Sequence, residues 1–284
     1  MIPTMNLFPD WFVRTVNPLA GLLRAQRVSY AKYISSILST DGKEGHTNVS
    51  HATVFHSLTE DPKLPPLEKR LDRLVTEAQS LVGAGTLTSA HMLFSTTYHI
   101  LANPPVLEKL LSELDALIPD PSEMPTLVQL EELPYLTAII NEGLRISYGT
   151  VHRLSRVHPD KALQYHDWVI PPGVAVGMTS LFIHDDPTIF PSPHTFLPER
   201  WLGSDAKEKA KYLFNFGKGT RQCVGINLAY AEFYHTLAAV FRNFGRTLEL
   251  YETDFETDVQ VKHDFFTTAP RLDSKGMRVV IRKE

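Results

Sequence analysis

The most informative segment of the chain reads FGKGTRQCVG and runs from Phe216 to Gly225. Its three glycines bend the chain into a loop, and the loop leads directly into an amphipathic helix that we expect from Ile226 to Phe244. The loop presents a sulfur, that of Cys223, just before the N-terminus of this helix. The helix dipole and the neighbouring Arg221 both favour a thiolate over a thiol at this place.

Several kinds of site could use a cysteine in such a loop. A lone cysteine is most often a small buried hydrophobic residue, so its surroundings must decide. The glycine spacing is not that of a P-loop, and Gln222 stands where a dinucleotide-binding loop needs its third glycine. A catalytic nucleophile needs a paired histidine, and the nearest downstream, His235, lies about three turns along the next helix. A thiolate on a bent loop can instead bind a haem iron as its axial ligand.

Composition and charge exclude several classes of protein. The 284 residues are 43% hydrophobic and 21% charged, which is ordinary for a globular chain and wrong for a disordered one. The net charge of −4 gives no basic surface for nucleic acid, so no nucleic-acid partner is expected. One cysteine excludes a disulfide within the chain and a multi-cysteine zinc site. No run approaches the ~20 apolar residues that span a bilayer.

The hydrophobic pattern predicts a mainly α fold with a minor β-sheet, in a single domain over residues 1–284. A polar stretch over 39–50 should separate the first helices, and 184–203 should form a long ordered loop. The expected helices cover 17–38, 53–60, 67–101, 106–117, 131–146 and 226–244. The expected strands cover 167–170 and 174–178, joined by a turn at 171–173, and 278–281.

The long helix carries two glycines near its middle, Gly83 and Gly85. Each costs up to ~1 kcal/mol relative to alanine in a helix interior, so something should compensate. One interpretation is a kink or a tight helix crossing. The other is a planar ligand that lies against the bare backbone.

Two further motifs accompany the cysteine loop. Glu142 and Arg145 form an E-x-x-R pair on one face of the fourth helix, and Arg200 lies in the segment PERW over 198–201. An isolated i, i+3 ion pair contributes only ~0.2–0.5 kcal/mol. Arg200 could complete a buried Glu–Arg–Arg network, in which losing one partner costs ~3–5 kcal/mol.

These motifs, in this order and with the glycine-bearing helix upstream, closely resemble the cytochrome P450 superfamily, and most of all the microsomal-type enzymes of fungal secondary metabolism. The resemblance implies that the chain folds as the C-terminal part of a P450 and binds haem (heme) with Cys223 as the iron ligand. Phe216 and Gly225 match defining positions of the family's haem-binding loop. Arg156 and Arg221 are then candidates to pair with the haem propionates.

The resemblance also explains the glycines of the long helix. Ala84 and Gly85 would belong to the haem-facing, oxygen-binding groove of that helix, and Thr88 would be its catalytic threonine. The implied activity is that of a haem-thiolate monooxygenase that inserts one oxygen atom from O2 into an apolar small molecule. The implied electron donor is NADPH–cytochrome P450 reductase. The family resides at the endoplasmic reticulum membrane, whereas no anchor is seen in this sequence, so a cytoplasmic or peripheral location is expected.

Two departures from the family pattern keep other functions open. Leu87 stands where the family has an acid before the threonine, which puts proton delivery in doubt and admits a haem-thiolate isomerase or dehydratase. The family's N-terminal anchor, main sheet and first propionate-binding helix have no counterpart here, so we expect a truncated gene product or partial gene model that lacks about two-fifths of the enzyme. Such a chain could also be a non-catalytic remnant.

Overall fold

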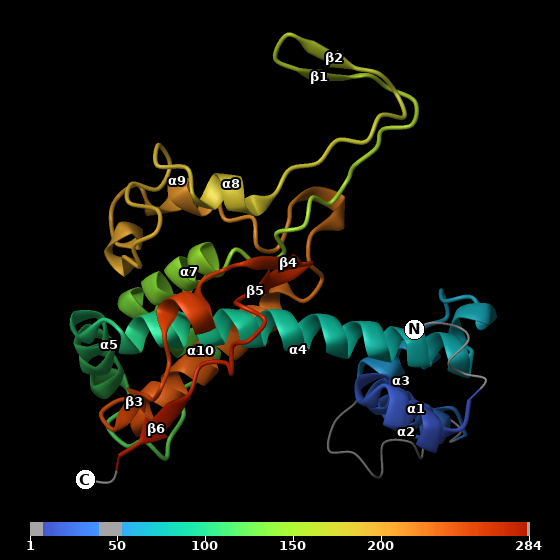
Figure 1. Ribbon diagram of the computed structural model, residues 1–284, viewed down its shortest axis with the longest axis horizontal. Coiled ribbons are helices and arrows are strands. Elements are labelled where there is room, and N and C mark those ends of the chain that lie inside the picture. The colour runs from blue at the N-terminus through green and yellow to red at the C-terminus, as the bar shows by residue number, and fades with distance from the viewer. Residues whose placement is uncertain (1–7, 40–52, 283–284) are drawn as a thin grey trace. The chain divides into compact units, whose positions relative to one another are not determined.

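The computed structural model describes residues 8–39 and 53–282 and consists mainly of α-helices (Figure 1). The chain divides into two compact units, residues 1–86 and 87–284. The boundary between them falls inside the long helix α4 (Leu71–Leu101). The assignment of the whole chain to one domain stays a prediction.

The first unit packs short and long helices around a small apolar cluster. Its elements are α1 (Asp10–Val16), α2 (Pro18–Ser39), α3 (Val54–Glu60), η2 (Pro66–Lys69) and the first half of α4. Its core consists of Ile34, Leu74, Val75 and Ala78. The predicted helices over 17–38 and 53–60 are confirmed, whereas the predicted break over 39–50 lies outside the described residues apart from Ser39, which still belongs to α2.

The long helix begins later than its pattern predicts, at Leu71 rather than Leu67. Pro66 is the first residue of the separate 3-10 turn η2, and Arg70 after it is extended, with φ −67° and ψ 146°. A proline has no N–H to continue a helix from the preceding residues, so it opens a new turn.

In the second unit, α10 packs against α5, α6 and α7. The helices of this unit, after the end of α4, are α5 (Pro104–Leu117), α6 (Leu127–Glu131), α7 (Pro134–Ser147), α8 (Ser180–His184), α9 (Ala206–Ala210) and α10 (Ile226–Phe244), with the short turns η3 (Pro198–Trp201), η4 (Gly219–Arg221) and η5 (Phe255–Val259). Their shared core is centred on fully buried leucines, isoleucines and phenylalanines such as Leu136, Ile139 and Phe241. The predicted helices over 106–117 and 226–244 are confirmed, and the one from 131 begins three residues later because Pro134 occupies its first position.

Within residues 8–39 and 53–282, the strands form three two-stranded antiparallel sheets. The pairs are β1 (Leu163–Tyr165) with β2 (Trp168–Ile170), β3 (Leu248–Leu250) with β6 (Val279–Ile281), and β4 (His263–Phe265) with β5 (Thr267–Ala269). In Figure 1 the last strand, β6, lies beside β3 near the C-terminus. The predicted strands over 167–170 and 278–281 are therefore confirmed in position.

The predicted pairing of 167–170 with 174–178 is wrong. Strand β2 pairs instead with β1, through a tight turn in which His166 takes a positive φ of 50°. Residues 171 and 172 are prolines without an N–H to donate, so the ladder ends before them. Residues 174–178 contribute one isolated bridge, between Val176 and Arg156.

Within the described ranges, none of the helices combines the length and the apolar character that crossing a bilayer requires.

Candidate functional site

Two glycines in the left-handed region shape the loop that carries Cys223. Gly217 has φ +65° and Gly219 has φ +74°, a conformation that costs a residue with a Cβ roughly 1–2 kcal/mol. The Gly217 N–H donates to the Phe214 carbonyl at 2.9 Å, and the Cys223 N–H donates to the Phe216 carbonyl at 2.8 Å. These bonds fix the backbone of the loop, while the side chain of Cys223 stays exposed.

The sulfur of Cys223 lies next to the start of α10. Gly225 is the N-cap of this helix, and a Cβ built on it would lie 3.9 Å from Cys223 Sγ. The first N–H groups of a helix have no partner within the helix, and they form the positive end of its dipole. The sulfur therefore lies close to the positive end of the helix dipole.

Apolar residues flank Cys223 in the loop and in the first turn of α10. Phe216 is half-buried, joins the core and has its ring centroid 5.4 Å from that of Tyr230, which ties the loop to α10. Val224 and, in the first turn of α10, Leu228 are 93% and 64% exposed. A soft thiolate ligand with uncovered apolar side chains beside it suits the iron and the apolar face of a haem.

Both arginines that the sequence predicts as propionate ligands are exposed. Arg156 lies on the segment bridged to Val176, and its Nη1 donates to the carbonyls of Leu154 and Ser155, each at 3.2 Å. Arg221 ends η4, two residues before Cys223. Within residues 53–282, neither guanidinium forms an ion pair with a carboxylate, so each can accept an anionic partner.

The remaining predicted site residues lie on α4, which is exposed throughout residues 81–88. Ala84 and Gly85 belong to the first unit and Thr88 to the second. Among the described residues of the first unit, a Cβ built on Gly83 or Gly85 has no atom within 4 Å. Packing in that unit therefore does not explain the glycines.

Glu142 stands at the centre of a fully buried polar network that the sequence predicts. Its carboxylate accepts bonds from Arg145 Nε (2.9 Å) and Nη2 (2.8 Å) and from Arg200 Nε (3.1 Å). It also accepts the Leu197 N–H and the Trp201 indole N–H, each at 2.9 Å. The Glu–Arg–Arg network is thus confirmed, and Trp201, which directly follows Arg200, adds a donor that the motifs did not predict.

The other donors of the two arginines reach backbone carbonyls. Arg145 Nη1 donates to His184 at 3.0 Å and Nη2 to Thr195 at 3.3 Å, and Arg200 Nη1 donates to Pro191 at 3.0 Å. Glu142 and Arg145 are 0% exposed. The network therefore ties α7 to the segment over 184–201 through bonds that water does not weaken.

Comparison with known proteins agrees with this arrangement. A family model for cytochrome P450 matches residues 2–272. The chain belongs to the cytochrome P450 family. It is 48% identical to the cytochrome P450 monooxygenase sdnE of Sordaria araneosa over 246 residues, which are 85% of this chain and 47% of that protein. It is 42% identical to the tryptophan 6-hydroxylase fscE of Fusarium equiseti over 98% of this chain and 54% of that protein.

A third relative, the cytochrome P450 monooxygenase oblB of Emericella variicolor, is 44% identical over 91% of this chain and 47% of its own length. The P450 chain thus spans about half the length of the curated relatives that it matches.

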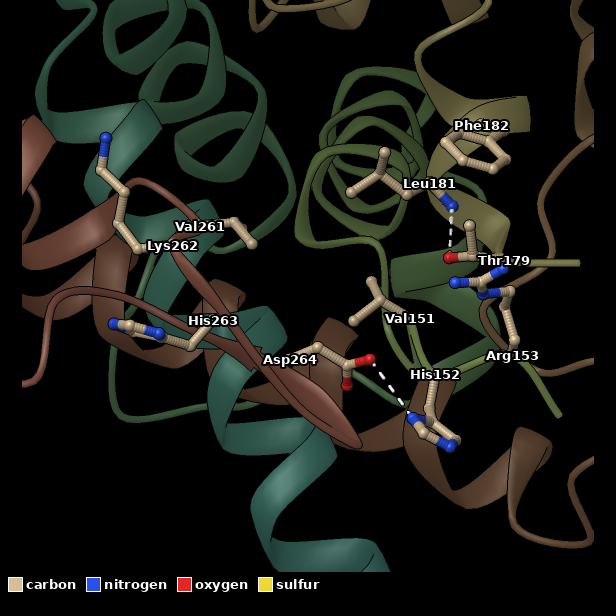
Figure 2. A pocket seen from close by; sticks show the side chains of 10 residues that line it. All are labelled: Val151, His152, Arg153, Thr179, Leu181, Phe182, Val261, Lys262, His263 and Asp264. Atoms are coloured by element: carbon tan, nitrogen blue, oxygen red, sulfur yellow. Dashed lines mark hydrogen bonds and ion pairs between the residues drawn. The ribbon is translucent and has the colours of Figure 1, made fainter.

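The second unit of this P450 also contains an open pocket of about 450 Å³ (Figure 2). Three segments line it, 151–153, 179–182 and 261–264. His152 Nδ1 lies 3.3 Å from Asp264 Oδ2 across it. Figure 2 shows Lys262 and Arg153 on opposite sides, so their cations do not converge on one ligand.

Two buried histidines near the Glu142 network make the P450 chain sensitive to acid. Burial lowers the pKa of His99 and of His184 to about 4. The His99 ring stacks on Phe196 at a centroid distance of 5.0 Å, and His184 Nε2 accepts the Phe214 N–H at 3.1 Å. Both rings are therefore neutral in the folded chain over the range in which the unfolded chain takes up protons.

We expect the free energy of unfolding to fall as the pH is lowered from 6.5 to about 4, by up to about 1.4 kcal/mol per pH unit for each histidine. Below its ordinary pKa, each histidine binds a proton in the unfolded chain only, so acid favours unfolding. Urea unfolding at several pH values measures the slope. His99→Phe keeps the ring stack and should reduce the slope by the contribution of one histidine. Equal slopes in wild type and His99→Phe would contradict the prediction.

Proposed function

We propose that this chain carries the haem-binding part of a P450 monooxygenase that inserts one oxygen atom from O2 into an apolar small molecule. The observation that carries the proposal is the exposed sulfur of Cys223, held on a glycine-bent loop at the N-terminus of α10. The names of the relatives, among them two monooxygenases and a hydroxylase, support the same reaction class.

The residues of the cysteine loop would hold the haem. Cys223 would ligate the iron, and the bound haem thiolate supplies the activation of O2. Phe216 anchors the loop to the core, and Gly225 keeps the space beside the sulfur free of a side chain. Arg156 and Arg221 would neutralise the propionates, since neither has a carboxylate partner among the described residues of the second unit.

The family resemblance assigns Ala84, Gly85 and Thr88 of α4 to the oxygen-binding groove. Ala84 and Gly85 present a helix surface without bulky side chains. Thr88 would contribute a hydroxyl that donates a hydrogen bond to O2. Leu87 cannot hold a proton, so the proton must come through Thr88, Thr86 or water.

The proposal includes a redox partner and a cellular location. Electrons would come from NADPH–cytochrome P450 reductase, and the chain would act in the cytoplasm or peripherally at the endoplasmic reticulum membrane, where the family resides. Both follow from the family resemblance and from the redox partner that a P450 monooxygenase needs.

The test is reconstitution of the chain with haem, followed by the spectrum of the reduced carbonyl complex. A strongly red-shifted Soret band would support thiolate ligation, and product that requires both reductase and NADPH would support monooxygenation. Product without either of them would indicate an isomerase or dehydratase instead. A melting temperature that haem does not raise would indicate a non-catalytic remnant.

A further inference from the structure

The hairpin of β4 and β5 is joined to two helices at a single side chain, Thr268. Its Oγ1 lies 2.5 Å from His91 Nε2 on α4 and 3.3 Å from the carbonyl oxygen of Ser147 at the end of α7. Thr268 is buried, and it is separated from His91 by 177 residues of sequence. All three residues belong to the second unit.

The three groups form one buried polar cluster. The Ser147 carbonyl can only accept, and the threonine hydroxyl has one hydrogen to donate. Which of His91 Nε2 and Thr268 Oγ1 donates to the other depends on the imidazole tautomer. Burial lowers the pKa of His91, so the ring is neutral near neutral pH and carries one proton that it can share within the cluster.

The turn between β4 and β5, which the contacts of Thr268 with His91 and Ser147 hold in place, is strained. Phe266 has φ +77°, and a bulky residue adopts the left-handed region only where its surroundings enforce it. Its N–H donates to Asp264 Oδ1 at 2.9 Å, and its carbonyl accepts the Val151 N–H at 3.2 Å. Despite this fixation the two aromatic side chains of the turn, Phe265 and Phe266, are 62% and 53% exposed.

His91 follows Thr88 by three residues on α4, so both side chains lie on the same side of the helix, one turn apart. We propose that His91 is a positioning residue of this P450. Through Thr268 it holds the Phe265–Phe266 turn at a fixed distance from Thr88. It thereby sets how much space a substrate has beside that threonine. The inference rests on the proposed monooxygenase function.

A first experiment tests whether the His91–Thr268 hydrogen bond holds the turn, and it needs no haem. Chymotrypsin cleaves after phenylalanine, and we expect Thr268→Val and His91→Phe to be cut at the Phe265–Phe266 turn about fivefold faster than wild type, the factor expected for loss of one ordinary hydrogen bond. Thr268→Ser and His91→Gln keep a hydroxyl and an N–H donor and should restore the wild-type rate. Thr267→Val is the matched control, because no hydrogen bond of its hydroxyl is recorded within residues 53–282.

The cleavage pattern separates a local effect from general unfolding. Faster cleavage that is confined to the turn supports the proposal that the His91–Thr268 hydrogen bond holds it. Unchanged cleavage in Thr268→Val and His91→Phe, or equal acceleration in Thr267→Val, would overturn it. If Thr268→Val unfolds and is cut throughout, the milder pair His91→Phe and His91→Gln decides by the same criterion.

A second experiment tests positioning, with the haem-loaded chain and two azoles as probes. Imidazole needs little space, whereas 4-phenylimidazole also occupies the space where a substrate would lie. We expect Thr268→Val to change the Kd of 4-phenylimidazole, measured from the Soret shift, at least fivefold and that of imidazole less than twofold. An unchanged ratio of the two constants would overturn the positioning role alone. A wild-type chain that binds neither azole would contradict the proposed function, and this inference with it.

Discussion

Replacing Cys223 by alanine should abolish the red-shifted Soret band of the reduced carbonyl complex and all reductase-dependent product formation. The chain has no other cysteine, so no second thiolate can take its place. Cys223→His should bind haem through nitrogen and give a band without the shift. Val224→Ala is the matched control, because it removes the exposed neighbour and leaves the sulfur. A red-shifted band in Cys223→Ala would contradict the assignment.

The same variants distinguish a ligand from a structural residue. The side chain of Cys223 is exposed, and substitutions at such positions usually change stability by less than about 0.5 kcal/mol. Without haem, Cys223→Ala should therefore melt at the wild-type temperature. With haem, only the wild-type chain should gain the stabilisation that a ligand of the native state provides. Loss of stability in the haem-free variant would show that Cys223 supports the fold instead.

Those parts of the fold that depend on nearby residues could be predicted from the sequence. The helix over 226–244 follows from its apolar period and from the glycine before it. The cysteine loop can be recognised from ten consecutive residues. Its Gly217 and Gly219 adopt the positive φ that glycine tolerates. Glu142 and Arg145 are three residues apart, so their pairing is also a local property.

The features that the sequence did not reveal depend on contacts between distant segments. His91 and Thr268 are 177 residues apart, and neither belongs to a motif. Residues 174–178 have the β-branched pattern of a strand, yet a strand forms only where a partner offers its backbone, and here the partner is a single residue, Arg156. Pairing partners depend on the whole topology, which periodicity does not encode.

Replacing Glu142 by glutamine should lower the free energy of unfolding by about 3–5 kcal/mol, a large part of the roughly 5–15 kcal/mol that stabilises a typical domain. The glutamine has the same size, but it carries no charge, so the guanidinium groups of Arg145 and Arg200 remain buried without a counter-ion. Its amide group also turns a donor toward the Trp201 N–H or an arginine N–H, where the carboxylate accepts at 2.8 to 3.1 Å. Urea unfolding of the chain measures the loss.

Glu199→Gln provides the matched control for this prediction. Glu199 bonds to Lys109 Nζ at 2.6 Å and accepts the Tyr135 hydroxyl at 2.9 Å. The side chains of Glu199 and Lys109 are 35% and 55% exposed, and an ion pair in water contributes no more than about 1 kcal/mol. The same chemical change should therefore cost several times more at Glu142 than at Glu199. If the two variants lost equal stability, the burial of the Glu142 carboxylate would not be what makes the network important. A large difference would show that the E-x-x-R pair supports the fold because no water reaches it.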